Sequence, residues 1–163
     1  MTLYSIGHSN ISIAAFLALL QRYQITVLVD TRSQPYSRYN PQFRREALQQ
    51  AVTEQGLAYH FLGDRIGGKP AEAKFYLPNG KVDYDLLRAA PAFQAGIKQL
   101  LALAAQQRVA FMCAEADYKH CHRYWLITRT LVEQGIAVEH ILPAGDTASS
   151  FARDFEPAQP SLF

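Results

Sequence analysis

The sequence is poor in cysteine, with only Cys113 and Cys121 among 163 residues. Two cysteines do not suggest a disulfide framework. The sequence also lacks an apolar run of transmembrane length, and residues 1–10 lack a secretory pattern. These absences together predict a reduced cytoplasmic protein with no membrane segment.

Charged residues are also modest, at 18% against 49% hydrophobic residues, and the net charge is only +2. The whole chain therefore does not attract polyanions by net charge alone. Basic residues are concentrated locally, since four arginines and no acidic residue lie between Thr31 and Arg45. Such a segment can bind phosphate, although most charge runs are solvated surface.

Neither an internal repeat nor a low-complexity tract is present, and short apolar segments alternate with segments of helical periodicity. The predicted strands are 3–6, 25–30, 57–62, 108–113 and 137–142, and the predicted helices lie near 13–20, 41–54, 93–106 and 118–134. This alternation predicts a single α/β domain over residues 1–142. We expect a mostly parallel sheet of about five strands with helices on both faces, a Rossmann-like or flavodoxin-like three-layer sandwich. Segments 25–30 and 108–113 are the most continuously apolar and should be central. Residues 143–163 show no strong periodicity and are predicted to form a tail.

Three of the predicted strands are followed by polar residues. The carboxyl ends of parallel strands share one edge of the sheet, where ligands of open α/β sheets bind. We therefore expect one site that combines His8 and Ser9 after the first strand, Asp30 and Arg32 after the second, and Cys113, Glu115 and Arg123 after the fourth.

Asp30, Glu115 and His8 are the candidate catalytic residues. The two carboxylates can serve as an acid/base pair or bind a divalent cation. The alternatives are a helix cap or an ion pair with Arg32 for Asp30, and an ordinary surface position for Glu115.

Arg32, Arg38, Arg123 and Ser9 are the candidate anion-binding residues, because guanidinium groups bind phosphate and carboxylate in bidentate fashion. If they bind an anion, replacing Arg32 or Arg123 with alanine should weaken binding and spare stability. The alternative is a structural ion-pair network. Tyr36, Tyr39 and Phe43 are interleaved with arginines, a mixture that suits base stacking and backbone contacts in nucleic acid. The alternative is that these aromatic side chains pack on the core.

The two cysteines are candidates for a nucleophile or for structural thiols. Cys121 begins a predicted helix, a position that can depress a thiol pKa. It also shares a helical face with Tyr124, Thr128 and Leu131, which favours a buried, inert thiol. Cys113 ends an apolar strand and is predicted to be in the core. A zinc site built from the cysteines, His120 and His122 would lack the usual ligand spacing, so no metal is assigned.

Several motifs in order resemble the bacterial and archaeal family catalogued as domain of unknown function 488. They are Ile6-Gly7-His8-Ser9, Leu28-Val29-Asp30-Thr31-Arg32-Ser33, Pro35 with Ser37-Arg38, Asn40-Pro41-Gln42-Phe43, Leu62-Gly63, Gly67-Gly68, and Met112-Cys113-Ala114-Glu115 with Cys121-His122-Arg123. They span residues 3 to 142, nearly the whole chain. This chain has Thr31 where the family usually has valine. The resemblance implies a shared fold and a shared site more than a reaction.

The last five residues, Gln159-Pro160-Ser161-Leu162-Phe163, resemble the short bacterial peptide that docks on the DNA-polymerase sliding clamp. Gln159, Leu162 and Phe163 would make the contacts. The alternative is an apolar tail that folds back on the domain.

These features favour an enzyme of DNA repair or processing that hydrolyses an N-glycosidic or phosphodiester bond in DNA or a nucleotide derivative. Two alternatives remain open. One is a non-catalytic module that binds nucleic acid or protein on a shallow basic surface. The other is a small-molecule enzyme with an anionic substrate.

Overall fold

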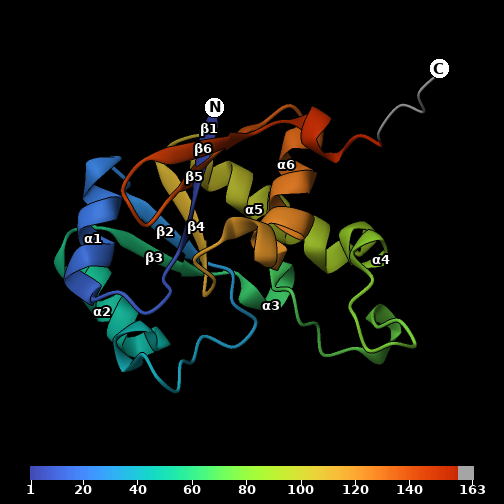
Figure 1. Ribbon diagram of the computed structural model, residues 1–163, viewed down its shortest axis with the longest axis horizontal. Coiled ribbons are helices and arrows are strands. Elements are labelled where there is room, and N and C mark those ends of the chain that lie inside the picture. The colour runs from blue at the N-terminus through green and yellow to red at the C-terminus, as the bar shows by residue number, and fades with distance from the viewer. Residues whose placement is uncertain (158–163) are drawn as a thin grey trace.

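A computed structural model describes residues 1–157. Its centre is a sheet with the strand order β3-β2-β4-β1-β5-β6 (Figure 1). Strands β1 to β5 are parallel, and β6 runs antiparallel to β5. The strands are β1 Thr2–Gly7, β2 Val27–Asp30, β3 Ala58–Phe61, β4 Val109–Cys113, β5 Ala137–Ile141 and β6 Thr147–Ser150.

Strands β2 and β4 are parallel neighbours, and every residue in both is buried. Their continuous apolar sequences fit this place, because a strand covered on both faces has no solvent side. The prediction that these two segments are central and parallel is confirmed.

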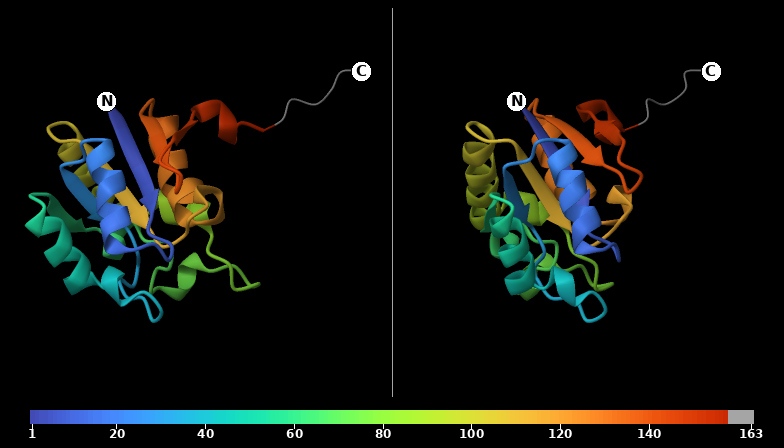
Figure 2. Two further views of the ribbon diagram at one scale, coloured as in Figure 1. Left: turned by 60° about the vertical axis from the view of Figure 1, so that its left-hand side comes forward. Right: turned by 90° about the vertical axis from the view of Figure 1, so that its left-hand side faces the viewer.

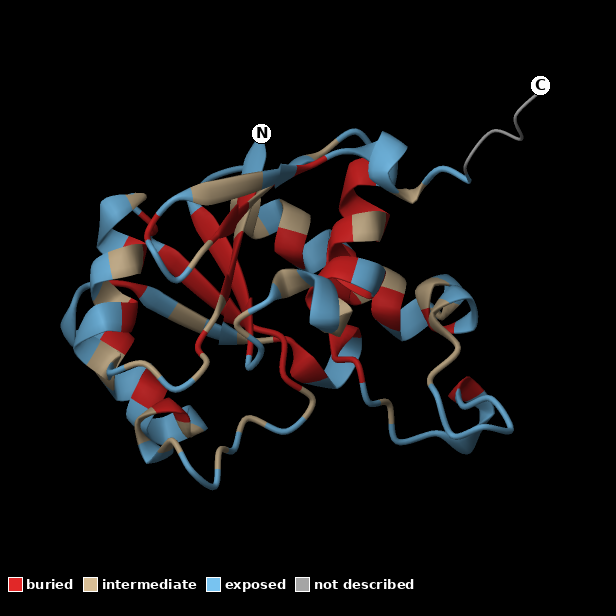
Figure 3. Ribbon diagram, in the orientation of Figure 1, coloured by how far each residue is buried: buried red, intermediate tan, exposed pale blue. Residues whose placement is uncertain are grey.

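Helices cover both faces of the sheet (Figure 2). On one face, α1 (Ile13–Arg22) and α2 (Arg45–Glu54) pack against the sheet through Phe16, Leu20, Leu48 and Val52. The other face carries α3 (Gly63–Ile66), α4 (Tyr84–Ala89), α5 (Pro91–Ala104) and α6 (Arg129–Glu133). The buried residues therefore form two apolar layers, one on each side of the strands (Figure 3).

The structure corrects three details of the sequence-based fold. The sheet has six strands rather than five, and its order is neither the Rossmann nor the flavodoxin order. The domain also extends past residue 142, because β6 pairs with β5 and Phe155 packs on Tyr124. Strand β6 has the sequence Thr-Ala-Ser-Ser, which lacks the apolar character that marks a strand in a sequence.

The predicted helix over 118–134 is divided into a short turn and a continuous helix whose first part is π-helical. A 3-10 turn spans Tyr118–His120, a π-helix spans Arg123–Thr128, and α6 follows from Arg129. The Thr128 hydroxyl donates a hydrogen bond to the carbonyl of Arg123, five residues earlier, at 2.6 Å. π-turns are rare and are frequent at functional sites.

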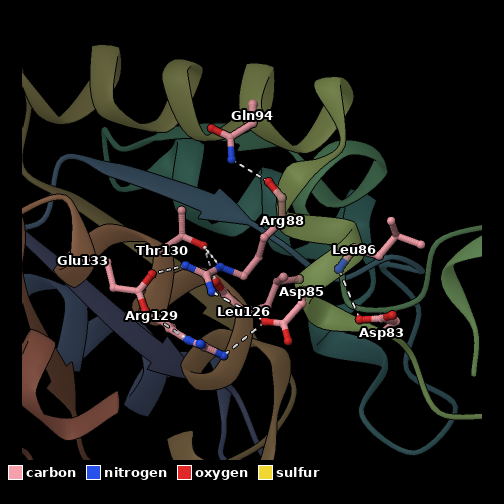
Figure 4. A network of polar contacts seen from close by, with 9 residues as sticks. All are labelled: Asp83, Asp85, Leu86, Arg88, Gln94, Leu126, Arg129, Thr130 and Glu133. Atoms are coloured by element: carbon pink, nitrogen blue, oxygen red, sulfur yellow. Dashed lines mark hydrogen bonds and ion pairs between the residues drawn. The ribbon is translucent and has the colours of Figure 1, made fainter. Parts of the chain in front are cut away.

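Helix α4 is fixed to α6 by charged side chains (Figure 4). Arg88 pairs with Glu133, and Arg129 pairs with both Glu133 and Asp85. The Nε–H of Arg88 also donates to the Thr130 hydroxyl at 3.0 Å. This network holds in place the helical segment that begins beside the cysteines.

None of the helices in residues 1–157 has both the length and the apolar character that crossing a membrane requires.

Candidate functional site

The site lies at the carboxyl ends of β2 and β4. The segment after β2 leads to α2 on one face, whereas the segment after the adjacent β4 leads to the π-helix on the other. Chains that diverge in this way leave a crevice at the strand ends. A cavity of about 270 Å³ opens there, which we call the thiol pocket. Its walls are Arg32, Ser33, Gln34, Tyr36, Lys69, Cys113, Ala114, Glu115, Cys121 and His122.

Asp30 lies at the end of β2 but is fully buried and forms an ion pair with Arg32. One carboxylate oxygen accepts from the backbone N–H of Arg32 at 3.2 Å and from its Nε–H at 2.9 Å. The other accepts from Nη2 of Arg32 at 2.7 Å and from the hydroxyl of Tyr59 at 2.6 Å. Each oxygen therefore has two donors, and a carboxylate offers about four acceptor positions in all. The arrangement matches the ion-pair alternative for Asp30 rather than an acid/base role.

Arg32 reaches the pocket wall with only 5% of its surface exposed. Besides binding Asp30, its Nη1 donates to the carbonyl of Phe43 at 2.7 Å. Most of its donors are therefore committed to the protein, and its charge is paired with Asp30, so Arg32 forms the pocket wall rather than a free anion-binding group.

Arg123 is completely buried and does not face a ligand. Its Nη2 donates to the carbonyl of Glu115 at 3.0 Å, and its Nη1 donates to the hydroxyl of Ser5 at 3.2 Å. Within residues 1–157 its Nε–H is a buried donor with no partner. Arg123 therefore positions the loop after β4, and the anion-binding role expected for it is not what this geometry shows.

His8 and Ser9 lie beside the thiol pocket, in a neighbouring hollow that also includes Glu115. The His8 ring stacks on Phe43, with 4.4 Å between ring centroids. Burial lowers the pKa of His8 to about 4, so the imidazole is neutral near pH 7. A neutral ring nitrogen 3.4 Å from Nη1 of Arg32 can accept its hydrogen bond. Ser9 has a positive φ of 46°, which turns the chain away from β1.

Glu115 and Arg38 are both exposed, but only Glu115 lines the pocket. Arg38 lies over the ring of Tyr39 at 5.5 Å from its centroid. The structure therefore brings Glu115 to the site and leaves Arg38 on the adjacent loop. Within residues 1–157, no group of three or more His, Cys, Asp or Glu side chains is placed to hold a metal ion, and the oxygens of Asp30 are already occupied by Arg32 and Tyr59.

The two cysteines meet at the pocket wall, and both are free thiols. Their sulfur atoms are 2.8 Å apart. The thiol of Cys113 hydrogen-bonds to Cys121 and, with the charge of Arg123, lowers the pKa of Cys121 to about 7. Burial and the same hydrogen bond raise the pKa of Cys113 well above its usual value. Cys121 is only partly buried, so it is not the inert core thiol that the helical pattern favours.

The family model described as domain of unknown function DUF488 matches residues 12–130. This match covers more than half of the chain. The protein belongs to the DUF488 family. No curated protein and no solved structure shows significant similarity to this DUF488 chain.

Two pocket residues of this DUF488 protein, Lys69 and His122, are absent from the site predicted from sequence. The ring of His122 packs against Gly68, where an added Cβ would lie 2.6 Å from the His122 Cβ. His122 Nε2 lies 3.0 Å from the carbonyl of Thr31, and burial lowers the pKa of His122 to about 4. The Gly67-Gly68 pair was the signal that could have placed this segment at the site, because paired glycines allow close backbone approach.

Gly7 supports the same loop from the opposite side, and its replacement gives a testable result. A Cβ at Gly7 would lie 1.7 Å from the carbonyl oxygen of Glu115. We expect Gly7→Ala to lower the free energy of unfolding by about 1–3 kcal/mol and to change the alkylation rate of Cys121, because the loop after β4 must move. Urea unfolding and iodoacetamide kinetics measure the two effects.

Gly56→Ala is the matched control. Gly56 has a positive φ of 81° with no atom within 4 Å of an added Cβ, so the substitution strains the backbone without touching the pocket. Gly56→Ala should lower the free energy of unfolding by about 1 kcal/mol and leave the alkylation rate of Cys121 unchanged. Equal alkylation rates of Cys121 in Gly7→Ala and in the wild type would show that Gly7 does not determine the conformation of the loop after β4.

The sliding-clamp peptide predicted from Gln159, Leu162 and Phe163 lies outside the described residues and stays a prediction.

Proposed function

We propose that this DUF488 protein is an enzyme that hydrolyses an N-glycosidic or phosphodiester bond in DNA or a nucleotide derivative, with the thiol pocket as its active site. The observation that carries the proposal is the composition of this pocket. One cavity brings together a lysine, an exposed carboxylate and a thiol with a depressed pKa. Such groups converge where substrates are bound and transformed.

An anionic substrate fits the charges of the pocket. Lys69 is exposed at its rim and forms no ion pair within residues 1–157. The buried Arg32 also lines the pocket, but its charge is balanced by the ion pair with Asp30. Lys69 can therefore bind a phosphate as a point charge, without first breaking an ion pair of its own.

A nucleotide or single-stranded nucleic acid is favoured by the aromatic residues beside the pocket. Tyr36 is 63% exposed, and the guanidinium of Arg44 lies 4.6 Å from its ring centroid. Tyr39 is 82% exposed on the same loop. Exposed rings of this kind, supported by arginines, provide stacking surfaces for bases. A base on Tyr36 would place its phosphate near Lys69.

The chemistry would fall to Glu115. Glu115 is the carboxylate with access to the cavity, since the oxygens of Asp30 are occupied by Arg32 and Tyr59. In this proposal Glu115 activates water or protonates the leaving group. A non-catalytic module would present a shallow surface, so the walled cavity favours an enzyme. Its small volume also suits the second candidate, an enzyme for a small anionic molecule.

The test is an assay of the full-length protein with mononucleotides and single-stranded oligodeoxynucleotides. Chromatography detects a released base, and gel electrophoresis detects a cleaved backbone, so the two chemistries are separated by their products. We expect Glu115→Gln to lower kcat/KM by about 100-fold and Lys69→Ala to weaken substrate binding by about tenfold.

The matched controls are Glu72→Gln and Lys74→Ala, which remove an exposed ion pair that lies outside the pocket. Neither should change the rate. Wild-type protein that neither binds nor cleaves these substrates would refute the nucleotide proposal. Turnover of a small anionic ester without nucleotide binding would favour the second candidate.

A further inference from the structure

The pairing of Cys113 with Cys121 carries an inference that does not depend on the hydrolysis proposed above. Cys113 ends β4 and Cys121 lies just before the π-helix, so the loop of residues 114–120 brings their sulfur atoms to 2.8 Å. A disulfide bond is about 2.05 Å long. The sulfur atoms would therefore have to approach by less than about 1 Å, which is within the range of small side-chain rotations.

The loop between the cysteines is already held in the shape that keeps the thiols together. Arg123 donates to the carbonyls of Glu115 and Ala116 at 3.0 Å and 3.4 Å. The indole N–H of Trp125 donates to the carbonyl of Lys119 at 2.8 Å. The backbone N–H of Ser9 binds the carbonyl of Ala114 at 2.9 Å. This support opposes separation of the two thiols.

The two thiols are chemically unequal. The backbone N–H of Arg123 donates to the sulfur of Cys121 at 3.3 Å, and Cys121 is partly exposed on the pocket wall. Cys113 has only 1% of its surface exposed, and its environment keeps it protonated. Thiolate character and access favour reaction at Cys121, whereas Cys113 is placed to react with whatever forms there.

We propose that Cys113 and Cys121 are a reversible redox pair, in which Cys121 reacts with a hydroperoxide and Cys113 resolves the product. The Cys121 thiolate attacks one peroxide oxygen and breaks the O–O bond, which gives a sulfenic acid on Cys121 and releases hydroxide or alkoxide. The Cys113 thiol then attacks the sulfenic sulfur, the S–O bond breaks, and the disulfide forms with loss of water. The sulfur pair loses two electrons and the peroxide gains them. A cellular dithiol restores both thiols by exchange.

The oxidised pair would change the pocket directly, because the thiolate on its wall would be lost. In the reducing cytoplasm expected from the sequence, the pair rests as the dithiol and oxidises only when peroxide rises. Oxidation of the two cysteines is therefore also a means by which peroxide can alter ligand binding in the thiol pocket.

The test treats the full-length protein with stoichiometric hydrogen peroxide, followed by blocking of free thiols and trypsin digestion. Trypsin cuts after Arg108, Lys119 and Arg123, so the disulfide would join peptide 109–119 to peptide 120–123. We expect this cross-linked peptide, with a loss of about two mass units that a dithiol reverses.

Two variants assign the roles. Cys113→Ser should stop at a sulfenic acid on Cys121, which a 1,3-dicarbonyl reagent captures. Cys121→Ser should react at least about tenfold more slowly, because the buried thiol of Cys113 remains. Melting temperatures close to that of the wild type confirm that both variants are folded.

The proposal is overturned if folded wild-type protein keeps both thiols while a free cysteine in the same solution is consumed. It is overturned equally if the disulfide joins two protein molecules, or if Cys113 is the residue that reacts first.

Discussion

Asp30→Asn should lower the free energy of unfolding by about 3–5 kcal/mol, because it leaves the guanidinium of Arg32 buried without its counter-charge. The expectation from sequence alone was different, since Arg32 was predicted to bind an external anion and to tolerate replacement. The structure instead places both partners in the interior, with Asp30 fully buried and Arg32 5% exposed. Urea unfolding of the variant and the wild type measures the loss.

A double-mutant cycle separates the ion pair from the general cost of substitution. Arg32→Met should lower the free energy of unfolding as much as Asp30→Asn does. The double variant should lower it by less than the sum of the two single effects. Glu72→Gln is the surface control, because Glu72 and Lys74 are each 66% exposed, and it should cost less than about 1 kcal/mol. A loss below about 1 kcal/mol for Asp30→Asn would show that Arg32 finds another partner.

Acid should destabilise the protein well before its carboxylates are protonated. Burial lowers the pKa of His140 from 6.5 to about 3, and that of His8 from 6.5 to about 4. The ring of His140 is fully buried between the hydroxyls of Ser5 and Ser150, at 2.5 Å and 2.7 Å, and stacks on Tyr118. Its position leaves no room for solvent around an added charge.

The sign of the effect follows from proton binding. Below pH 6.5 the unfolded chain binds protons at these histidines, whereas the folded chain does not until the pH nears the lowered pKa. Stability is therefore fully present above pH 6.5 and falls as the pH drops toward 4. Each of these histidines contributes up to about 1.4 kcal/mol per pH unit, and His122, whose pKa burial also lowers to about 4, acts in the same direction.

Urea unfolding at several pH values between about 7 and 4.5 checks this expectation. His140→Gln should make the pH dependence shallower, because an amide can bind both serines without titrating. His120→Gln, at an exposed position, serves as the control for the substitution itself. A flat stability profile in the wild type would mean that the buried rings accept protons without cost.

The sequence predicted the architecture of the sheet centre because continuous apolar runs of strand length are typical of strands that are covered on both faces. It also predicted that the residues after β1, β2 and β4 gather at one edge, which follows from parallel strands. It did not reveal whether a charged residue at that edge faces the cavity or the interior. Asp30 and Arg32 are the clearest case, since the further partners that hold their ion pair inward, Tyr59 and the carbonyl of Phe43, come from other elements of the fold.

Cys121 shows a different limit of sequence reasoning. Its predicted burial assumed a helix of 3.6 residues per turn through Leu131, but the segment passes through a break and a π-helix. Periodicity cannot place a side chain where the period itself changes. Lys69 was missed for a related reason, because the connection that carries it has no pattern of its own and takes its position from contacts with Ser33 and His122.

The π-helix also affects how this stretch of the chain can vary in length. A π-turn takes up one extra residue with little change in the direction of the segments on either side of it. Removing one residue between Tyr124 and Thr128 would therefore restore an ordinary helix and leave Cys121 and Arg123 close to their present direction relative to α6. The shorter segment would lose the wide turn and its hydrogen bond from the Thr128 hydroxyl to the carbonyl of Arg123. Sequence alignments of proteins that keep this pocket should therefore tolerate a single-residue gap here, even where the side chains themselves differ.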